Sequence, residues 1–333
     1  MKTLIKNAKL IDGKSVDILI ENGIVVRIGN GRNISADVVI DADGKYAVSG
    51  CVNAYFDGNI DEASKLLSQG VTTVFDFSND DKITKYLIDK GIKVFKAIGD
   101  FDGETLLNES FLEQQVENNK KLGVVKSILY LKNPNESEGD NFNTVITNAS
   151  KNNFIVATHV SETLENVGEI DKEFGMSPIG LLENYGFLDR KCLLIDCVYV
   201  DKEDVEILNN YDVNIITCPT NNLSDGYGIA PVYSFIKNGL NVLVGGVSSN
   251  HFKEIRLVGD LQSGVLNEKS IINISDLKNM NCYNARKIFN EIGGLNEGLS
   301  ADIVLLNDNN LMNLTPINVK MVFVNGKLVY QQK

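Results

Sequence analysis

Eight short apolar segments alternate with amphipathic segments through the middle of the chain, and this alternation constrains the fold more than any other feature. The apolar segments lack a clean two-residue period, which indicates strands that are buried on both faces. They are AVSGCVNAY, VTTVFDF, IKVFKAIGD, VVKSILYLK, NFIVATHV, KCLLIDCVYV, VNIITCPT and NVLVGGV. Several intervening segments, such as DEASKLLSQG and PVYSFIKNG, end in glycine, as helices commonly do. Eight strands joined by helices predict a (β/α)8 TIM-type barrel over residues 49–298, with functional residues just past the C-terminal ends of its strands.

The two ends of the chain follow a different pattern. Residues 1–48 and 299–333 contain short β-branched runs separated by Asp-Gly and Asn-Gly turn signals, as in DILIENGIVV and VKMVFVNGKLVY. Neither end is long enough to bury a core alone, so we predict that they pair into one small β-sandwich domain. A doubly wound open sheet is the alternative architecture. It explains the strand count but not the two β-rich ends.

The net charge of the chain indicates which binding partners to expect, and its cysteines indicate the cellular compartment. The net charge is −12 and the isoelectric point is about 4.8, so the surface repels phosphate backbones and anionic lipid. We therefore expect no nucleic-acid or membrane partner. The N-terminus lacks the apolar run of a signal peptide, and no stretch approaches the roughly 20 apolar residues that cross a bilayer. The five cysteines lie in apolar runs without metal-type spacing, which is typical of free thiols in a cytoplasmic protein.

Several stretches, in order from end to end, resemble one family. They are KNAKLIDG near the start, GVTTVFDF at the second strand, ATHVSET at the fifth, VNIITCPTNNLSDGYGIAPV at the seventh, and NARKIFNEIGGLNEGLSADIVLLN before the last strands. This pattern is similar to the amidohydrolase superfamily, in the branch of cytosine deaminase, guanine deaminase and the triazine chlorohydrolases. The resemblance implies a barrel with an appended sandwich and a bound metal ion that activates water to hydrolyse C–N bonds.

Two of the family's functional positions are retained. The fifth-strand histidine, a metal ligand, is matched by His159, and the glutamate that assists proton transfer is matched by Glu162. The sixth-strand histidine is matched by Asp196, and the histidine that follows it is matched by Tyr199. The resemblance thus makes Glu162 and Asp196 the candidate catalytic residues.

The other metal positions are replaced. The family's first strand ends in His-x-His, and the matching residues here are Tyr55 and Asp57. The eighth-strand aspartate, both a ligand and a base, is matched by Val247. A hydrolytic zinc ion needs about three protein ligands, which the inherited positions no longer supply.

Four residues are candidates for the wall of a substrate pocket. Tyr55 and Tyr199 would fill the volume left by imidazole rings, while Asn221 and Asn222 match the family's turn beside the substrate after strand seven. The second histidine of the chain, His251, is expected at the surface.

These replacements favour a catalytically silent homologue that keeps the scaffold, holds no cofactor and binds a small molecule. The alternative is an active aminohydrolase with a rebuilt site, in which Asp57, His159 and Asp196 hold one Zn, Fe or Mn ion. A third hypothesis is a non-catalytic binding or regulatory subunit. Because relatives are commonly oligomers, we also expect a homo-oligomer.

Overall fold

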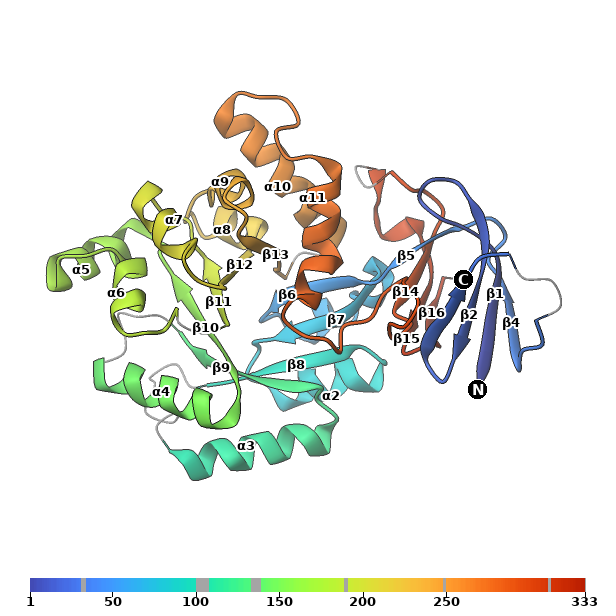
Figure 1. The fold of residues 1–333 in the computed structure, drawn as a ribbon, viewed down its shortest axis with the longest axis horizontal. Helices are drawn as coiled ribbons and strands as arrows, with labels where there is room; N and C mark the ends of the chain where they lie inside the picture. Colours follow the sequence, from blue (N-terminus) through green and yellow to red (C-terminus); the bar gives the residue numbers. More distant parts are fainter. Residues whose placement is uncertain are drawn as a thin grey trace.

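Two β-sheets lie side by side in the computed structural model of the chain, one ringed by helices and one built from both ends of the sequence (Figure 1). The structure describes residues 1–30, 34–99, 108–132, 139–188, 191–247, 250–310 and 313–332, without the side chains of residues 139–142. Within these ranges, no helix combines the length and the apolar character needed to span a bilayer.

The middle of the chain forms a parallel eight-stranded barrel in which neighbouring strands follow the order of the sequence. The strands are β6 (Cys51–Phe56), β7 (Val71–Asp76), β8 (Lys93–Ile98), β9 (Lys126–Leu131), β10 (Ile155–Val160), β11 (Cys192–Asp196), β12 (Asn214–Thr217) and β13 (Asn241–Val244). Gly246 N donates to Tyr55 O at 2.7 Å, and Asn53 Nδ2 donates to Gly246 O at 2.8 Å, so the segment after β13 is joined to β6. The predicted barrel is confirmed, and the doubly wound open sheet is wrong because the first and last strands meet.

Helices cover the outer face of the barrel (Figure 1). The helices of the described residues are α1 (Ile60–Ala63), α2 (Asp81–Asp89), α3 (Glu109–Leu122), α4 (Gly139–Asn152), α5 (Leu164–Phe174), α6 (Pro178–Asn184), α7 (Lys202–Leu208), α8 (Pro219–Ser224), α9 (Val232–Lys237), α10 (His251–Leu266), α11 (Ile274–Lys278) and α12 (Asn284–Arg286), with the π-helix η4 (Asn279–Tyr283) and the 3-10 helices η1 (Leu67–Gln69) and η6 (Pro316–Asn318). Side-chain caps fix where many of them begin. Asn59, Asp80, Asn108 and Thr163, for example, each accept a hydrogen bond from the first turn of their helix.

Alternate residues of each barrel strand point inward and fill the barrel. Members of this interior core include Val52, Ala54, Phe75, Phe95, Ile128, Ala157, Leu193, Ile195, Ile216 and Leu243, with Phe289 and Ile292 from the segment after α12. Side chains alternate between the two faces of a strand, so His159 faces the interior like Ala157, two residues before it. Because of this alternation, the side chain of His159, near the end of its strand, points into the barrel.

The two ends of the chain form a mixed sheet of β1 (Lys2–Lys9), β2 (Ser15–Glu21), β3 (Ile24–Ile28), β4 (Val38–Asp41), β5 (Tyr46–Ser49), β14 (Ile303–Leu306), β15 (Val319–Val324) and β16 (Lys327–Gln331). It curls around its own core, formed by residues such as Ile5, Ile18, Ala47, Ile303 and Phe323. The Asn325-Gly326 turn between β15 and β16 has the two positive φ angles, 49° and 71°, of the predicted hairpin. The predicted pairing of the two ends is confirmed.

A buried ion pair joins the barrel to this sheet. Lys93 Nζ on β8 lies 2.7 Å from Asp302 Oδ2, just before β14, and both side chains are almost fully buried. Asp302 also accepts hydrogen bonds from the backbone N–H groups of Gly293 and Asn325, both at 2.9 Å. One carboxylate therefore fixes three separate segments at the junction.

The barrel seam gives a test of stability. A Cβ added at Gly245 would lie 2.5 Å from the backbone nitrogen of Tyr55, which cannot move without breaking the seam. We expect Gly245→Ala to lower the free energy of unfolding by about 1–3 kcal/mol, as overpacking does. The matched control is Gly168→Ala in α5, where no atom lies within 4 Å and the free energy of unfolding should stay equal or rise. Urea unfolding of both variants measures this, and equal stabilities would contradict the role of the seam.

Candidate active site

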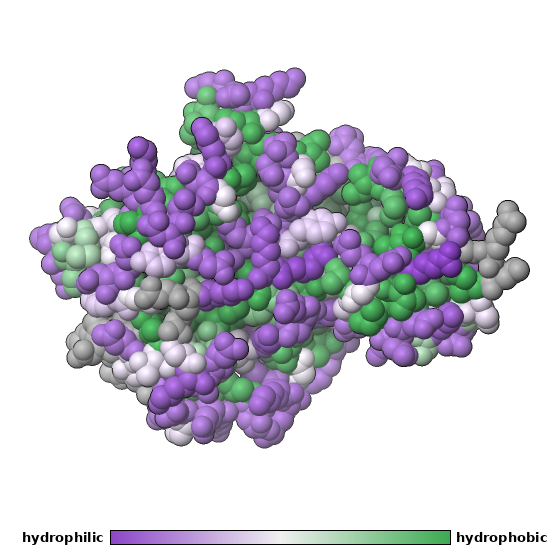
Figure 2. Space-filling model, in the orientation of Figure 1, coloured by the Kyte–Doolittle hydropathy of each residue, from purple (hydrophilic) through white to green (hydrophobic). Residues whose placement is uncertain are grey.

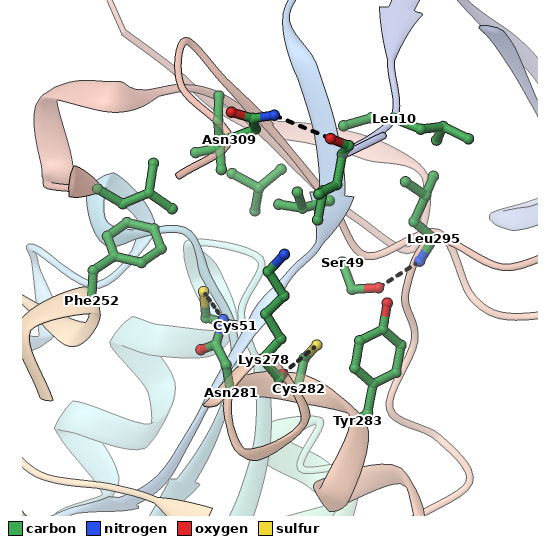
Figure 3. Close-up of a pocket in the computed structure, with 16 residues that line it drawn as sticks. Leu10, Ser49, Cys51, Phe252, Lys278, Asn281, Cys282, Tyr283, Leu295 and Asn309 are labelled. Carbon is green, nitrogen blue, oxygen red and sulfur yellow. Dashed lines mark hydrogen bonds between the residues drawn. The ribbon is translucent and has the colours of Figure 1, made fainter. Parts of the chain in front are cut away.

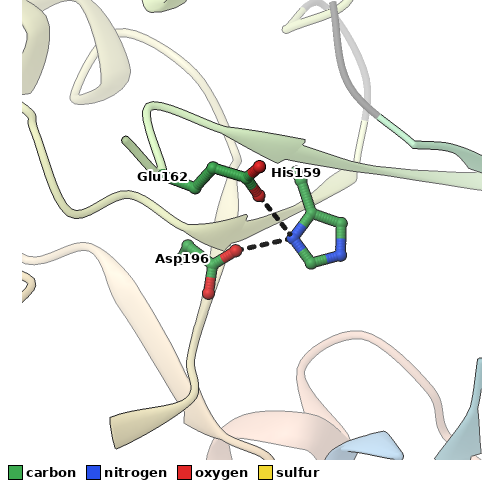
Figure 4. A group of neighbouring side chains, drawn as sticks. All are labelled: His159, Glu162 and Asp196. Atoms are coloured by element: carbon green, nitrogen blue, oxygen red, sulfur yellow. Dashed lines mark hydrogen bonds and ion pairs between the residues drawn. The ribbon is translucent and has the colours of Figure 1, made fainter. Parts of the chain in front are cut away.

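His159 is the centre of a polar cluster at the mouth of the barrel. Its Nδ1 atom lies 2.6 Å from Asp196 Oδ2 and 3.3 Å from Glu162 Oε2, so two carboxylates meet one ring nitrogen (Figure 4). Burial by itself lowers the pKa of His159. The charges and hydrogen bonds of Asp196 and Glu162 outweigh it and raise the pKa to about 9. In the metal-free protein the imidazole is therefore positively charged at neutral pH.

Glu162 lies in the turn that follows β10. The preceding residue, Ser161, has a φ of 52°, which turns the chain sharply at the end of the strand. Asn166 Nδ2 donates to Glu162 Oε1 at 3.2 Å, leaving Oε2 for His159. Partial burial raises the pKa of Glu162, but the hydrogen bond and charge of His159 outweigh this and lower the pKa overall.

Asp196 ends β11 in a strained backbone. Its φ is 75° and that of Cys197 is 48°, and a non-glycine residue in this region costs about 1–3 kcal/mol. The turn is held from β10, since Val198 N and Tyr199 N both donate to Ser161 O, at 3.0 and 2.9 Å. When the Asn222 amide takes the orientation in which both of its polar atoms are satisfied, its nitrogen donates to the second carboxylate oxygen, Oδ1, at 2.7 Å. Asp196 is thus aimed at His159 by contacts on both of its oxygens.

Tyr55 connects the far side of His159 to Asp57. The Tyr55 hydroxyl lies 3.3 Å from His159 Nε2 and donates to Asp57 Oδ2 at 3.1 Å. Asp57 lies at the exposed rim of the barrel. The protein around its carboxylate excludes part of the solvent, and this raises the pKa of Asp57. The three residues form a hydrogen-bonded chain that runs from the partly buried imidazole to the surface.

Aromatic rings surround the imidazole, and two of them are absent from the residues selected from the sequence. The Tyr55 ring lies 5.3 Å from the His159 ring and 4.9 Å from Phe77, while the Tyr130 ring lies 6.0 Å from His159. Phe77 follows β7 and Tyr130 is on β9, both on the inward side. The sequence could have indicated both residues, because they lie near the C-terminal ends of the second and fourth barrel strands, where functional residues are expected. Burial, followed by the charges of Glu162, Asp225 and Asp196, raises the pKa of Tyr227.

Other candidate residues are not part of the polar cluster. Tyr199 packs against the hydrophobic layer between the strands and the helices, as does Val247. Asn221 holds the segment after β13, since its Oδ1 accepts a hydrogen bond of 3.4 Å from Val247 N. The expected exposure of His251 is wrong. It is 1% exposed, its Nε2 lies 3.1 Å from Asn281 Oδ1, and burial lowers its pKa to about 4.

The cluster has the composition of a metal site. One nitrogen of His159 and one oxygen each of Glu162 and Asp196 all lie within 4.8 Å of one another. Atoms that share one ion at bond lengths of about 2.0–2.2 Å lie roughly 3–3.5 Å apart, so small side-chain rotations would complete the site. One imidazole and two carboxylates suit Zn, Fe or Mn. Asp57, expected as a ligand, lies outside this group and reaches it through Tyr55.

Comparison with known proteins agrees with this architecture. The model of the amidohydrolase family matches residues 61–329. A 5-methylthioadenosine/S-adenosylhomocysteine deaminase of Caldicellulosiruptor saccharolyticus is 27% identical, over 99% of this chain and 93% of that protein.

Solved structures share the fold at lower identity. Guanine deaminase from C. acetobutylicum, with guanine bound in its active site, has a TM-score of 0.83 at 17% identity, covering 99% of this chain and all of that one. An adenosine deaminase from Xanthomonas campestris with bound zinc has a TM-score of 0.82 at 14% identity, covering 98% and 92% of the two chains. On the match of the family model to most of its length, this chain belongs to the amidohydrolase family.

Proposed function

We propose that the protein is a metal-dependent hydrolase that removes an amino group from a small heterocyclic compound. The observation that carries the proposal is the cluster of His159, Glu162 and Asp196 at the barrel mouth, where enzymes of this fold hold their active sites. The deaminase names of relatives that align with nearly the whole chain support this active alternative over the silent homologue favoured by the sequence.

His159, Glu162 and Asp196 would hold the ion. A divalent ion in such a site supplies a reactive water by lowering the pKa of that water to about 7. Because a metal competes with the proton on His159 Nδ1, binding of the ion should release that proton. The Asn222 amide fixes Asp196 and the Asn166 amide fixes Glu162, so both carboxylates are oriented before the ion arrives.

Asp57 and Tyr55 would handle protons. With Glu162 occupied as a ligand, Asp57 is a carboxylate of the described part of the rim that would accept a proton and return it to the departing amine. Its raised pKa brings it closer to neutral pH, as a general acid–base requires. The Tyr55 hydroxyl keeps Asp57 Oδ2 facing the imidazole. The rings of Tyr55, Phe77 and Tyr130 supply apolar surface against which a flat heterocycle could stack.

The first test is metal content, measured by mass spectrometry on protein expressed without a histidine tag. We expect about one Zn, Fe or Mn ion per chain, lost in His159→Ala and in Glu162→Gln. The matched control is Glu165→Gln, an exposed carboxylate one turn further along, which should keep its metal. Ammonia release from 5′-methylthioadenosine, S-adenosylhomocysteine, 5′-deoxyadenosine and guanine would then be measured for the same variants.

A second candidate function is a silent scaffold that binds a small molecule. It is favoured by one observation: the His159 Nδ1 atom already has two carboxylate partners and needs no ion to be satisfied. Wild-type protein free of metal, with no ammonia released from any of the four compounds, would eliminate the first candidate and favour the second.

A further inference from the structure

A cavity of about 240 Å³ lies at the junction of the barrel and the mixed sheet, away from the barrel mouth. Its walls come from β5, β14, the start of α10 and the segment from the end of α11 through η4 (Figure 3). The surface is hollowed at this junction, and hydrophobic side chains line the hollow (Figure 2). It shares no lining residue with the cluster around His159.

Most of the lining is apolar. The side chains that define the hydrophobic wall are Leu10, Ile11, Phe252, Leu295, Val304, Leu306 and Leu314. No aspartate or glutamate is among the described residues that line the cavity. A molecule inside therefore meets hydrocarbon on several sides and no negative charge.

Several polar atoms of the lining already have protein partners. Leu295 N donates to Ser49 Oγ at 2.9 Å, Asn281 Nδ2 donates to Cys51 Sγ at 3.2 Å, and Asn309 Nδ2 donates to Ile11 O at 3.1 Å. These bonds, drawn in Figure 3, keep the corresponding groups from acting as ligand-binding donors.

Two donors remain directed at the cavity. The Lys278 side chain extends into it from the end of α11, and the Tyr283 hydroxyl points toward it from the end of η4 (Figure 3). Among the described residues, neither group has a hydrogen-bond or ion-pair partner. Lys278 is partly exposed, and an ammonium group beside apolar surface, with no carboxylate among the described lining residues, attracts an anionic ligand.

We propose that this cavity binds a small amphipathic carboxylate. The apolar part of the ligand lies against the Phe252, Leu295 and Leu314 side chains. The carboxylate accepts hydrogen bonds from the Lys278 ammonium and the Tyr283 hydroxyl. Lys278 is the one cation among the described lining residues, and its single positive charge matches one carboxylate.

The test is calorimetric titration of the full chain with octanoate, with octan-1-ol as an uncharged probe of the same length. We expect saturable binding of octanoate to the wild type, with the dissociation constant raised about tenfold or more in Lys278→Met, as for a lost hydrogen bond to a charged group. The alcohol should bind the wild type and Lys278→Met alike. Lys202→Met, which removes an exposed lysine on α7, is the matched control and should leave octanoate binding unchanged.

A second variant tests the cavity itself. Val48→Phe adds volume inside the lining and should abolish binding of both probes, while Lys278→Arg should keep most of the affinity for octanoate. Failure of octanoate to bind the wild type saturably would overturn the proposal. So would an equal dissociation constant in wild type and Lys278→Met.

Discussion

Replacing Asp302 by asparagine is expected to lower the free energy of unfolding by about 3–5 kcal/mol, because it leaves the Lys93 ammonium buried without a counter-charge. The side chains of this pair are 7% and 1% exposed, and their atoms are 2.7 Å apart. The amide would also present a donor to a site whose other partners, Gly293 N and Asn325 N, are themselves donors. The loss would be measured by urea unfolding at neutral pH.

A double-mutant cycle separates the ion pair from its surroundings. Lys93→Met combined with Asp302→Asn should be less destabilised than the sum of the two single variants, since no charge is then left unpaired. The control is Glu21→Gln in the Lys2–Glu21 pair, whose side chains are 37% and 44% exposed, where we expect a loss below about 1 kcal/mol. If Asp302→Asn cost no more than Glu21→Gln, the junction would not depend on the pair.

Raising the pH should remove a large part of the stability that His159 contributes to the metal-free protein. The pKa of His159 is about 9 in the folded chain, against about 6.5 in an unfolded one. A raised pKa means that the folded state holds the proton more tightly. The extra stability is therefore complete below about pH 6.5 and lost as the pH rises through 9. The shift corresponds to about 3 kcal/mol.

The measurement compares wild type with His159→Gln in the presence of a chelator, by urea unfolding at pH 6 and pH 10. The stability advantage of the wild type should fall by about 3 kcal/mol between the two values. Groups that do not interact with His159 titrate alike in both proteins and cancel in the comparison. An advantage that does not change with pH would mean that the ion pair with Asp196 and Glu162 adds nothing to folding.

The fold was accessible from the sequence because its signals are local and repeated. Eight buried strands separated by amphipathic helices are visible in the pattern of apolar residues, and the Asn325-Gly326 turn is visible from its two residues. The pairing of the two chain ends could be predicted because neither end is long enough to bury a core alone.

The candidate site was accessible only in part. The positions of His159, Glu162 and Asp196 follow from motif order, but their meeting at one nitrogen depends on left-handed backbone at Ser161 and Asp196, which is uncommon for any residue other than glycine. The sequence also does not show that the Tyr55 hydroxyl lies between Asp57 and His159. This contact keeps Asp57 away from the other expected metal ligands. His251 follows polar residues in the sequence and is nevertheless buried, because α10 packs its first turn against Gln69 and Asn281.

The pairing of β14 with β5 also has a consequence for how the protein is made. Ser49 lies opposite Ile303, so the edge of β5 has no neighbour on that side until nearly the whole barrel has left the ribosome. Domains usually fold in order of synthesis, but here the first strands must wait for the last ones. An unpaired strand edge invites association with other chains for as long as it stays open. The edge of β5 is therefore protected only once β14 has been synthesised and has paired with it.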